Sequence, residues 1–178
     1  MTVLSIIQPD NPILRRQAQR VTDFDAELQV IIDDMVETMT TAQGVGLAGP
    51  QVAHSRRLIV LRLPDDKESV EEYGEDAGKL YVVANPSIVW RSEDKVSGVE
   101  GCLSLPGLLG DVDRHESIEV AGQDRHGKPM RLSAGGWLAR VFQHEIDHLD
   151  GVLYIDIATD VWRPEEEESP AGEVSEVQ

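Results

Sequence analysis

Apolar residues recur at spacings of three and four between residues 28 and 39, and this pattern predicts an amphipathic helix with one buried face. Thr22 or Asp23 is its predicted cap, because a side-chain oxygen there can accept hydrogen bonds from unpaired backbone amides. Gly44 and Gly46 lie beyond its end, where the chain must turn sharply. We therefore expect an early helix that stops before a glycine-rich segment.

The helical spacing of apolar residues returns between residues 137 and 149. Ser133 is a candidate cap upstream of this second helix. Gly151 is placed to end the helix, since glycine adopts the left-handed conformation without steric cost.

Shorter apolar runs predict strands elsewhere in the chain. Pro64 closes the first of them, and Asn85-Pro86 closes the second. The third and fourth flank residues 124–127, where Gly127 suits a hairpin turn. The predicted strands cover residues 57–63, 80–83, 117–121, 130–132 and 152–155.

Together these elements predict one α+β domain, in which short antiparallel strands and mixed sheets pack around the late helix. The catalytic domain is expected to cover residues 1–162. Residues 163–178 form an acidic tail without periodicity, which we expect to be disordered. The acidic segment 65–76 is expected to be a surface loop.

The composition limits the classes of function. With 40% hydrophobic residues the chain can bury a core, and it contains no apolar run of about 18 residues, which a membrane-spanning helix needs. A formal net charge of −17 opposes binding to nucleic-acid phosphates, so we expect no direct DNA contact. Cys102 is the single cysteine, and the first ten residues do not read as a secretory signal, so a cytoplasmic protein is expected.

The late helix contains the strongest chemical motif, His144-Glu-Ile-Asp-His148. Side chains four residues apart lie on one helix face, so both imidazoles can reach one metal ion. Glu145 stands beside the first candidate ligand, where a carboxylate can accept a proton from metal-bound water. An ordinary polar helix can contain the same five-residue pattern by chance, so the motif needs a third ligand nearby.

Two other segments supply candidates for this chemistry. Cys102 can be the third ligand as a thiolate, although a lone cysteine is more often a small buried hydrophobic residue. The glycine-rich segment 44–51 lacks the lysine of a phosphate-binding loop. Its last residue, Gln51, offers an amide NH₂ that can stabilise a developing oxyanion.

Three stretches in this order resemble the peptide deformylase family. They are Gly44 to Gln51, Glu100-Gly-Cys-Leu-Ser104 and Gln143-His-Glu-Ile-Asp-His-Leu-Asp-Gly151. The resemblance extends over roughly residues 5–158. Gly49 departs from the family pattern, which usually has alanine there, and we expect the loop to be slightly looser for it.

The resemblance implies a metal-dependent amidase that removes the N-formyl group from the formylmethionine of nascent proteins and releases formate. One divalent ion is implied, usually ferrous iron, with zinc, nickel or cobalt often found in purified samples. The implied metal ligands are Cys102, His144 and His148. Glu145 is implied to move the proton, and Gln51 and the N–H of Leu103 are implied to bind the oxygen of the tetrahedral intermediate.

The methionine side chain then needs an apolar pocket beside the metal. Trp137 and Val141 share a helix face with the two histidines, and we expect them to line this pocket opposite Val45. The alternative is that both are plain core residues. Extended backbone around Gly46 and Gly101 is expected to pair with the substrate peptide.

The partners expected from this function are N-formylmethionyl peptides and, transiently, the ribosome. Candidate ribosome contacts are basic residues whose ordinary interpretation is surface charge: Arg15, Arg16, Arg20, Arg56 and Arg57. No membrane partner is expected, and the protein is expected to be a monomer.

Three other interpretations remain open at this point. A metallopeptidase that cuts internal peptide bonds would use the same helix, but its third ligand would usually follow His148. A structural zinc module would need a fourth protein ligand, from His54, His115, His126 or a carboxylate. The third is an inactive relative, although all the expected ligands are present.

Overall fold

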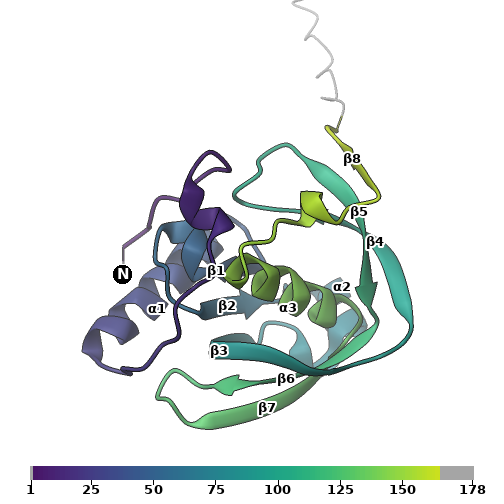
Figure 1. The fold of residues 1–178 in the computed structure, drawn as a ribbon. Helices are drawn as coiled ribbons and strands as arrows, with labels where there is room; N and C mark the ends of the chain where they lie inside the picture. Colours follow the sequence, from purple (N-terminus) through teal and green to yellow (C-terminus); the bar gives the residue numbers. More distant parts are fainter. Residues whose placement is uncertain (1, 165–178) are drawn as a thin grey trace, which may run out of the picture.

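A computed structural model describes residues 2–164, in which helix α3 (Gly136–Leu149) lies between two antiparallel sheets (Figure 1). The larger sheet has the strand order β1-β2-β3-β6-β7, and the smaller one has the order β4-β5-β8. Helix α1 (Ala26–Thr41) packs on the larger sheet. The predicted α+β class is confirmed, although parallel pairing in the described part is limited to two isolated bridges.

The remaining elements are short. Helix α2 covers Lys67–Tyr73, and 3₁₀ turns cover Pro12–Arg15, Gly49–Val52, Gly74–Asp76 and Tyr154–Asp156. The strands are β1 (Gly46–Ala48), β2 (Leu58–Arg62), β3 (Leu80–Arg91), β4 (Lys95–Gly101), β5 (Leu109–His115), β6 (Ser117–Gln123), β7 (Pro129–Gly135) and β8 (Asp160–Trp162).

Strand β2 is buried on both faces, which explains its continuous apolar sequence. Leu58 and Val60 belong to the core beneath α1, whereas Ile59 and Leu61 belong to the core beneath α3. Alternate side chains of a strand point to opposite faces, so the two helices cover opposite sides of the larger sheet. This arrangement encloses α3 and with it the histidine motif.

The predicted caps of both long helices are wrong. Asp25 caps α1 by accepting from the N–H of Leu28 at 2.9 Å, while the hydroxyl of Thr22 donates to Asp23 instead. Thr22, Asp23 and Asp25 all precede α1, and the apolar spacing alone does not show which of them caps the helix.

Helix α3 begins without a side-chain cap. Its N-cap is Gly135, and the predicted cap Ser133 lies in β7 opposite Glu119. Gly136 has φ +53°, and its N–H donates to the carbonyl of Glu116, so the strand turns directly into the helix. The prediction for Gly151 is confirmed, with φ +78° just beyond the helix end.

The acidic segment 65–76 is not a loop as predicted, since it contains α2. Asp66 caps this helix by accepting from the N–H groups of Glu68 and Ser69 and from the Ser69 hydroxyl. Tyr73 packs against the core from its last turn. The density of charge therefore concealed a short helix.

Strand β3 continues past Asn85-Pro86, where the sequence predicted its end. Asn85 has φ +53°, and the pairing with β6 shifts register between Ala84 and Ser87, so a bulge accommodates the proline. The pairing of β3 with β2 stops at Ala84, so Pro86 faces no β2 residue in the ladder. Proline, which has no backbone N–H, interrupts a strand where the ladder requires a donor at that position.

The strand predicted at residues 152–155 is also wrong, because the chain forms a 3₁₀ turn there. The turn covers Tyr154–Asp156, and Leu153 and Tyr154 are both buried. The carboxylate of Asp156 accepts from the N–H of Leu153 and holds the turn.

Gly49 does not loosen its loop as expected. A methyl group there would lie 2.6 Å from the carbonyl oxygen of Arg56 and 2.9 Å from that of His54, so backbone occupies the space. The segment is therefore closely packed rather than loose.

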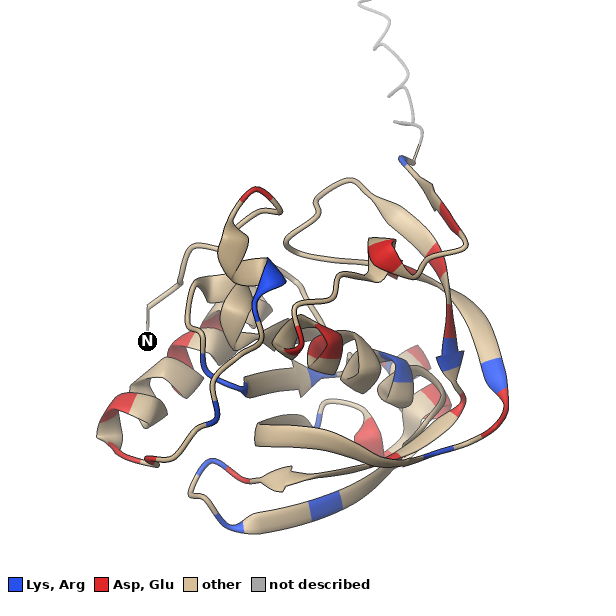
Figure 2. Cartoon of the chain, viewed as in Figure 1, with Lys and Arg blue, Asp and Glu red and all other residues tan. Residues whose placement is uncertain are grey.

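Charges are distributed over α1, the outer strands and the connections instead of forming a single face (Figure 2). Among residues 2–164, none of the helices combines the length and apolar character needed to cross a membrane. The predicted disorder of the acidic tail concerns residues 163–178, nearly all of which lie outside the described residues, so the domain boundary stays a prediction.

Candidate active site

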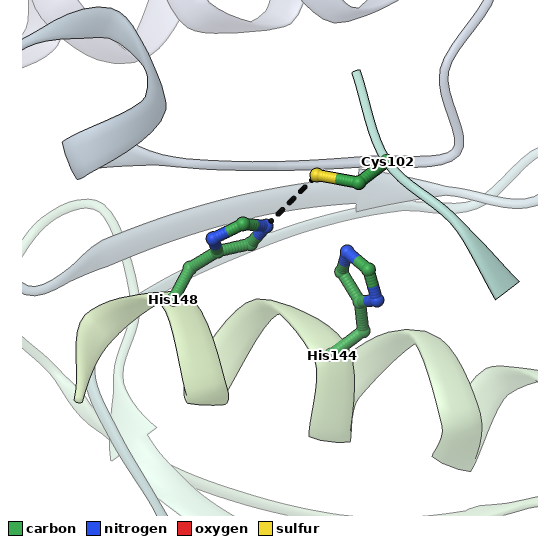
Figure 3. Close-up of side chains that lie close together, drawn as sticks. All are labelled: Cys102, His144 and His148. Carbon is green, nitrogen blue, oxygen red and sulfur yellow. Dashed lines mark hydrogen bonds between the residues drawn. The ribbon is translucent and has the colours of Figure 1, made fainter. Parts of the chain in front are cut away.

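Two histidines one turn apart on α3 face a cysteine that follows β4 (Figure 3). The candidate ligand atoms of Cys102, His144 and His148 all lie within 4.8 Å of one another. Sγ of Cys102 is 3.3 Å from Nε2 of His148. The sequence motifs from two distant segments therefore meet at separations that a single ion can bridge.

Glu100 orients the first histidine. Its Oε2 lies 2.9 Å from Nδ1 of His144, which leaves Nε2 as the nitrogen available to a metal. Burial acts to raise the pKa of Glu100, but hydrogen bonds with His144 and Arg114 outweigh it and lower the pKa to about 2. Burial also acts to lower the pKa of His144, but its contacts with Cys102 and Glu100 raise that pKa to about 10. Metal binding there has to displace a proton.

The chemistry of this group fits a divalent transition-metal ion. One thiolate and two imidazoles suit zinc, iron, nickel and cobalt alike. Burial lowers the pKa of His148 well below its usual value, so this imidazole is neutral, as a ligand must be. Within the described chain, Oε2 of Glu145 is buried without a hydrogen-bond partner, which suits a site that takes non-protein ligands.

Glu145 lies beside the ligands in a buried position. Burial raises its pKa to about 7, although the charge of His144 opposes the shift. A carboxyl with such a pKa can both accept and donate a proton near neutral pH. The backbone of Gly46 passes so close that an added Cβ would lie 2.3 Å from Oε1 of Glu145. Glycine at this position therefore leaves room for the carboxylate.

The side chain of Gln51 is held so that its NH₂ faces the site. Its Oε1 accepts from the backbone N–H of Ala48 at 2.8 Å, which fixes the orientation of the amide. Nε2 then lies 3.5 Å from Sγ of Cys102 and 3.3 Å from Oγ of Ser104. A donor is thus aimed at the space beside the cysteine.

Cys102, His144, Glu145 and Gln51 border a cavity of ≈ 350 Å³, which is within the range for small ligands. Edge strands of both sheets reach it, since β1 is the outer strand of the larger sheet and β4 that of the smaller one. All five residues expected to bind substrate are among its walls: Val45, Gly46, Gly101, Trp137 and Val141. Leu103 lies on the same wall as Gly101.

The family model described as polypeptide deformylase matches residues 3–163 of this chain. The chain belongs to this family. It is 46% identical to the peptide deformylase of Symbiobacterium thermophilum over 177 residues, which cover 99% of this chain and 76% of that protein. It is 49% identical to that of Thermus thermophilus over 150 residues, covering 82% of this chain and 77% of the other. The crystal structure of the Thermotoga maritima peptide deformylase superposes with a TM-score of 0.79 at 37% identity, covering 90% of this chain and all of that one.

Membership of the deformylase family and the geometry both weigh against a metallopeptidase that cuts internal bonds and against a structural zinc module. The Cys/His/His cluster is the single candidate metal group found among residues 2–164, and His54, His115 and His126 lie outside it. The third candidate ligand precedes α3 in the sequence instead of following it. The family and the cluster together support one metal ion.

Sequence reasoning gave no role to the polar residues that surround the deformylase motifs. Arg114 bonds Glu100 through Nε at 2.8 Å and Asp147 through Nη1 at 2.5 Å. Tyr154 stacks on the His144 ring at 5.9 Å between centroids and donates to the carbonyl of Leu108. Arg114 and Tyr154 lie outside the motifs, and their tertiary contacts leave no periodic signal in the sequence.

Proposed function

We propose that this protein is a peptide deformylase that hydrolyses the N-formyl group of formylmethionyl peptides and releases formate. The observation that carries the proposal is one cavity lined by Cys102, His144, Glu145 and Gln51, in which Cys102 and His144 form a candidate metal cluster with the adjacent His148. Cys102, His144 and His148 would hold the ion. A bound divalent ion supplies Lewis acidity, which makes the formyl carbon more electrophilic and a water molecule more acidic.

Glu145 is the group that moves the proton. Its carboxylate takes a proton from the attacking water and passes it to the departing amine, and a pKa near 7 suits both steps. Gln51 Nε2 and the N–H of Leu103 donate to the oxygen that becomes negative during the attack. Because the Gln51 amide is already oriented by Ala48, no rearrangement is needed as the charge develops.

The substrate peptide lies between the two sheet edges in this proposal. Gly46 of β1 and Gly101 of β4 present edge backbone to the cavity, and an extended peptide can pair with such edges whatever its sequence. The formyl carbon carries only hydrogen, which suits the narrow space between Gly46 and Glu145.

The methionine pocket is assigned to Trp137, Val141 and Val45. Val141 is buried and Trp137 partly buried, and both pack in the core beneath α3 while bordering the cavity. We expect Trp137→Ala and Val141→Ala to reduce the preference for N-formyl-Met over N-formyl-Gly peptides. Folded variants with an unchanged preference would show that both are core residues only.

Ferrous iron is the proposed working ion, with zinc, nickel or cobalt able to replace it. Iron beside the Cys102 thiolate is open to oxidation, so activity should decay in air faster with iron than with nickel. Equal decay of both forms in a timed aerobic assay would count against iron as the sensitive ion.

The proposed setting is a cytoplasmic monomer that contacts the ribosome transiently. Arg15, Arg56 and Arg57 pair with acidic residues of the chain, whereas Arg16 and Arg20 form no ion pair within residues 2–164. Arg16 and Arg20 are therefore the better contacts. A double Arg-to-Ala variant at these two positions should pellet less with ribosomes at low salt, and equal pelleting would remove them as contacts.

Formate release is the test of the proposed activity. Wild type and Glu145→Ala, both purified without oxygen and with measured metal content, are compared on an N-formyl-Met peptide and its unformylated equivalent. We expect formate from wild type only, with metal retained in both proteins. No formate from a folded, iron-loaded wild type would overturn the proposal.

A further inference from the structure

Arg140 lies on α3 one turn before His144, with its guanidinium buried between α3 and the smaller sheet. Nη1 donates to Oε1 of Glu100 at 2.9 Å and to the carbonyl of Val112 at 2.8 Å. Nη2 donates to the carbonyl of Val96 at 2.6 Å, and Nη1 also reaches that of Gly98 at 3.2 Å. One side chain of α3 is thus bonded to two strands through three backbone carbonyls and a carboxylate.

The bonds of Arg140 to β4 are spread along the strand toward Cys102. Val96, Gly98 and Glu100 are alternate residues of β4, and that strand ends at Gly101, directly before Cys102. The cysteine is thus held by one element and the two histidines by another. Arg140 fixes the position of β4 along α3, and so fixes where Sγ stands relative to the imidazoles.

Gly98 shows that the strand is shaped to receive this side chain. An added Cβ at Gly98 would lie 2.8 Å from Nη2 and 2.9 Å from Cζ of Arg140. Within residues 2–164, no atom other than these two lies within 3.0 Å of that position apart from those of Gly98 and its chain neighbours, so the glycine makes room for the guanidinium specifically. Lysine would not reproduce the contacts, because its single ammonium group cannot reach all the acceptors that the planar guanidinium contacts in different directions.

We propose that Arg140 is a positioning residue of the metal centre, which sets the distance between Cys102 and the histidine pair by bonding β4 to α3. It acts through Glu100 as well, because Oε1 of Glu100 takes the Arg140 bond while Oε2 holds His144. The inference rests on the proposed function only in placing the ion at these three residues. It does not depend on which substrate is cleaved.

Metal affinity tests the proposal without any reference to deformylation. The dissociation constant for Co²⁺ is measured by chelator competition, and the thiolate-to-cobalt absorption band reports the geometry. Arg140→Met and Arg140→Lys should both weaken Co²⁺ binding by about 10- to 100-fold, the range for outer partners of metal ligands, and should shift the band. Gly98→Ala should have the same effects, since it displaces the guanidinium without deleting any group.

Arg57→Met is the matched control. Arg57 also bonds carbonyl oxygens of a strand and of α3, those of Pro86 and Leu149, and the carboxylate of Asp150, but in the described chain it makes no hydrogen bond with β4 or with Glu100. It should lower thermal stability and leave the Co²⁺ constant and band unchanged. A loss of affinity in Arg57→Met equal to that in Arg140→Met would overturn the proposal, because it would mean that any loosening of α3 suffices.

The double variant Gly98→Ala/Arg140→Met separates positioning from packing. Without the guanidinium, the added methyl has nothing to displace, so the double variant should bind Co²⁺ as Arg140→Met alone does. Additive losses would contradict the proposal, as would wild-type affinity and spectrum in folded Gly98→Ala. If Arg140→Met fails to fold, Gly98→Ala still decides the question.

Discussion

The amide of Gln51 is oriented by backbone rather than by its ligand. Because Ala48 N–H occupies Oε1, the NH₂ group has one direction left, toward Cys102 and Ser104. Donors fixed in this way stabilise charge without reorganising, which is why they can matter more to a reaction than to stability.

Gln51→Glu tests this donor while keeping the acceptor for Ala48. We expect kcat to fall about 10²- to 10³-fold, or about 3 kcal/mol, because an oxygen replaces the NH₂ that faces the developing charge. The assay is formate release at saturating substrate. Gln43→Ala, at another wall of the same cavity, should stay near wild type, and an active Gln51→Glu would remove Gln51 from the oxyanion site.

Gly46→Ala tests the space around the carboxylate. The added methyl would lie 2.3 Å from Oε1 of Glu145, so the carboxylate has to move and kcat should drop steeply while the fold is kept. Circular dichroism and formate release are measured together. Gly135→Ala is the control, because its nearest neighbour would be 3.7 Å from the new Cβ, and it should remain active.

Among the helices and strands, α2 shows how a cap can outweigh an unfavourable composition. Four of the seven residues from Asp66 to Glu72 are acidic, yet the Asp66 carboxylate accepts three hydrogen bonds at the helix start. Hydrogen bonds with Ser69 lower the pKa of Asp66, so its charged form is the one that holds the helix.

Asp66→Ala should therefore make α2 open more readily. Amide hydrogen exchange at residues 67–73 is expected to become faster, with α1 and α3 unchanged, because the unpaired amides of the first turn lose their acceptor. Asp65→Ala removes an equal charge and should leave exchange as in wild type. Faster exchange in both variants would indicate a charge effect instead of a capping effect.

Elements with a clear apolar period were predictable from the sequence, and those built on buried polar groups were not. Helices α1 and α3, strand β2 and the β6–β7 hairpin all show the expected periods. Strands β4 and β5 place Glu100 and Arg114 on their buried face, where an apolar residue is the usual signal. The ion pair between them is a contact across strands, and one strand's sequence cannot reveal it.

The candidate site was predictable because its main residues lie in short, local sequence motifs. His144, Glu145 and His148 share one helical turn, and Cys102 stands in a short motif. The residues that hold the two segments together, Arg114 and Arg140, act through tertiary contacts. Their partners became visible only in the folded chain.

At the scale of the whole molecule, α3 is enclosed by two sheets, and the smaller of them has a very short edge strand. The smaller sheet ends in β8, a three-residue strand that pairs with Leu109, Gly110 and Asp111 of β5. Leu109 borders the cavity, so the last described strand supports the part of the site that β5 reaches.

Two truncations test this dependence. A chain ending at Pro164 should keep the formate release and melting temperature of the full chain, because every described element is retained. A chain ending at Thr159 loses β8 and should be less stable and less active, since β5 then has a free edge beside the cavity. Equal behaviour of the two would show that β8 does not support the site.

The separation of the candidate ligands along the chain also bears on how the protein is made. Cys102 and His148 are 46 residues apart and stand on elements that must dock before their side chains meet. A chain still under synthesis cannot assemble the trio until α3 has left the ribosome and packed between the sheets. Loading of the ion thus has to follow the emergence and packing of α3, and each new copy is inert toward other nascent chains until that step of its own folding.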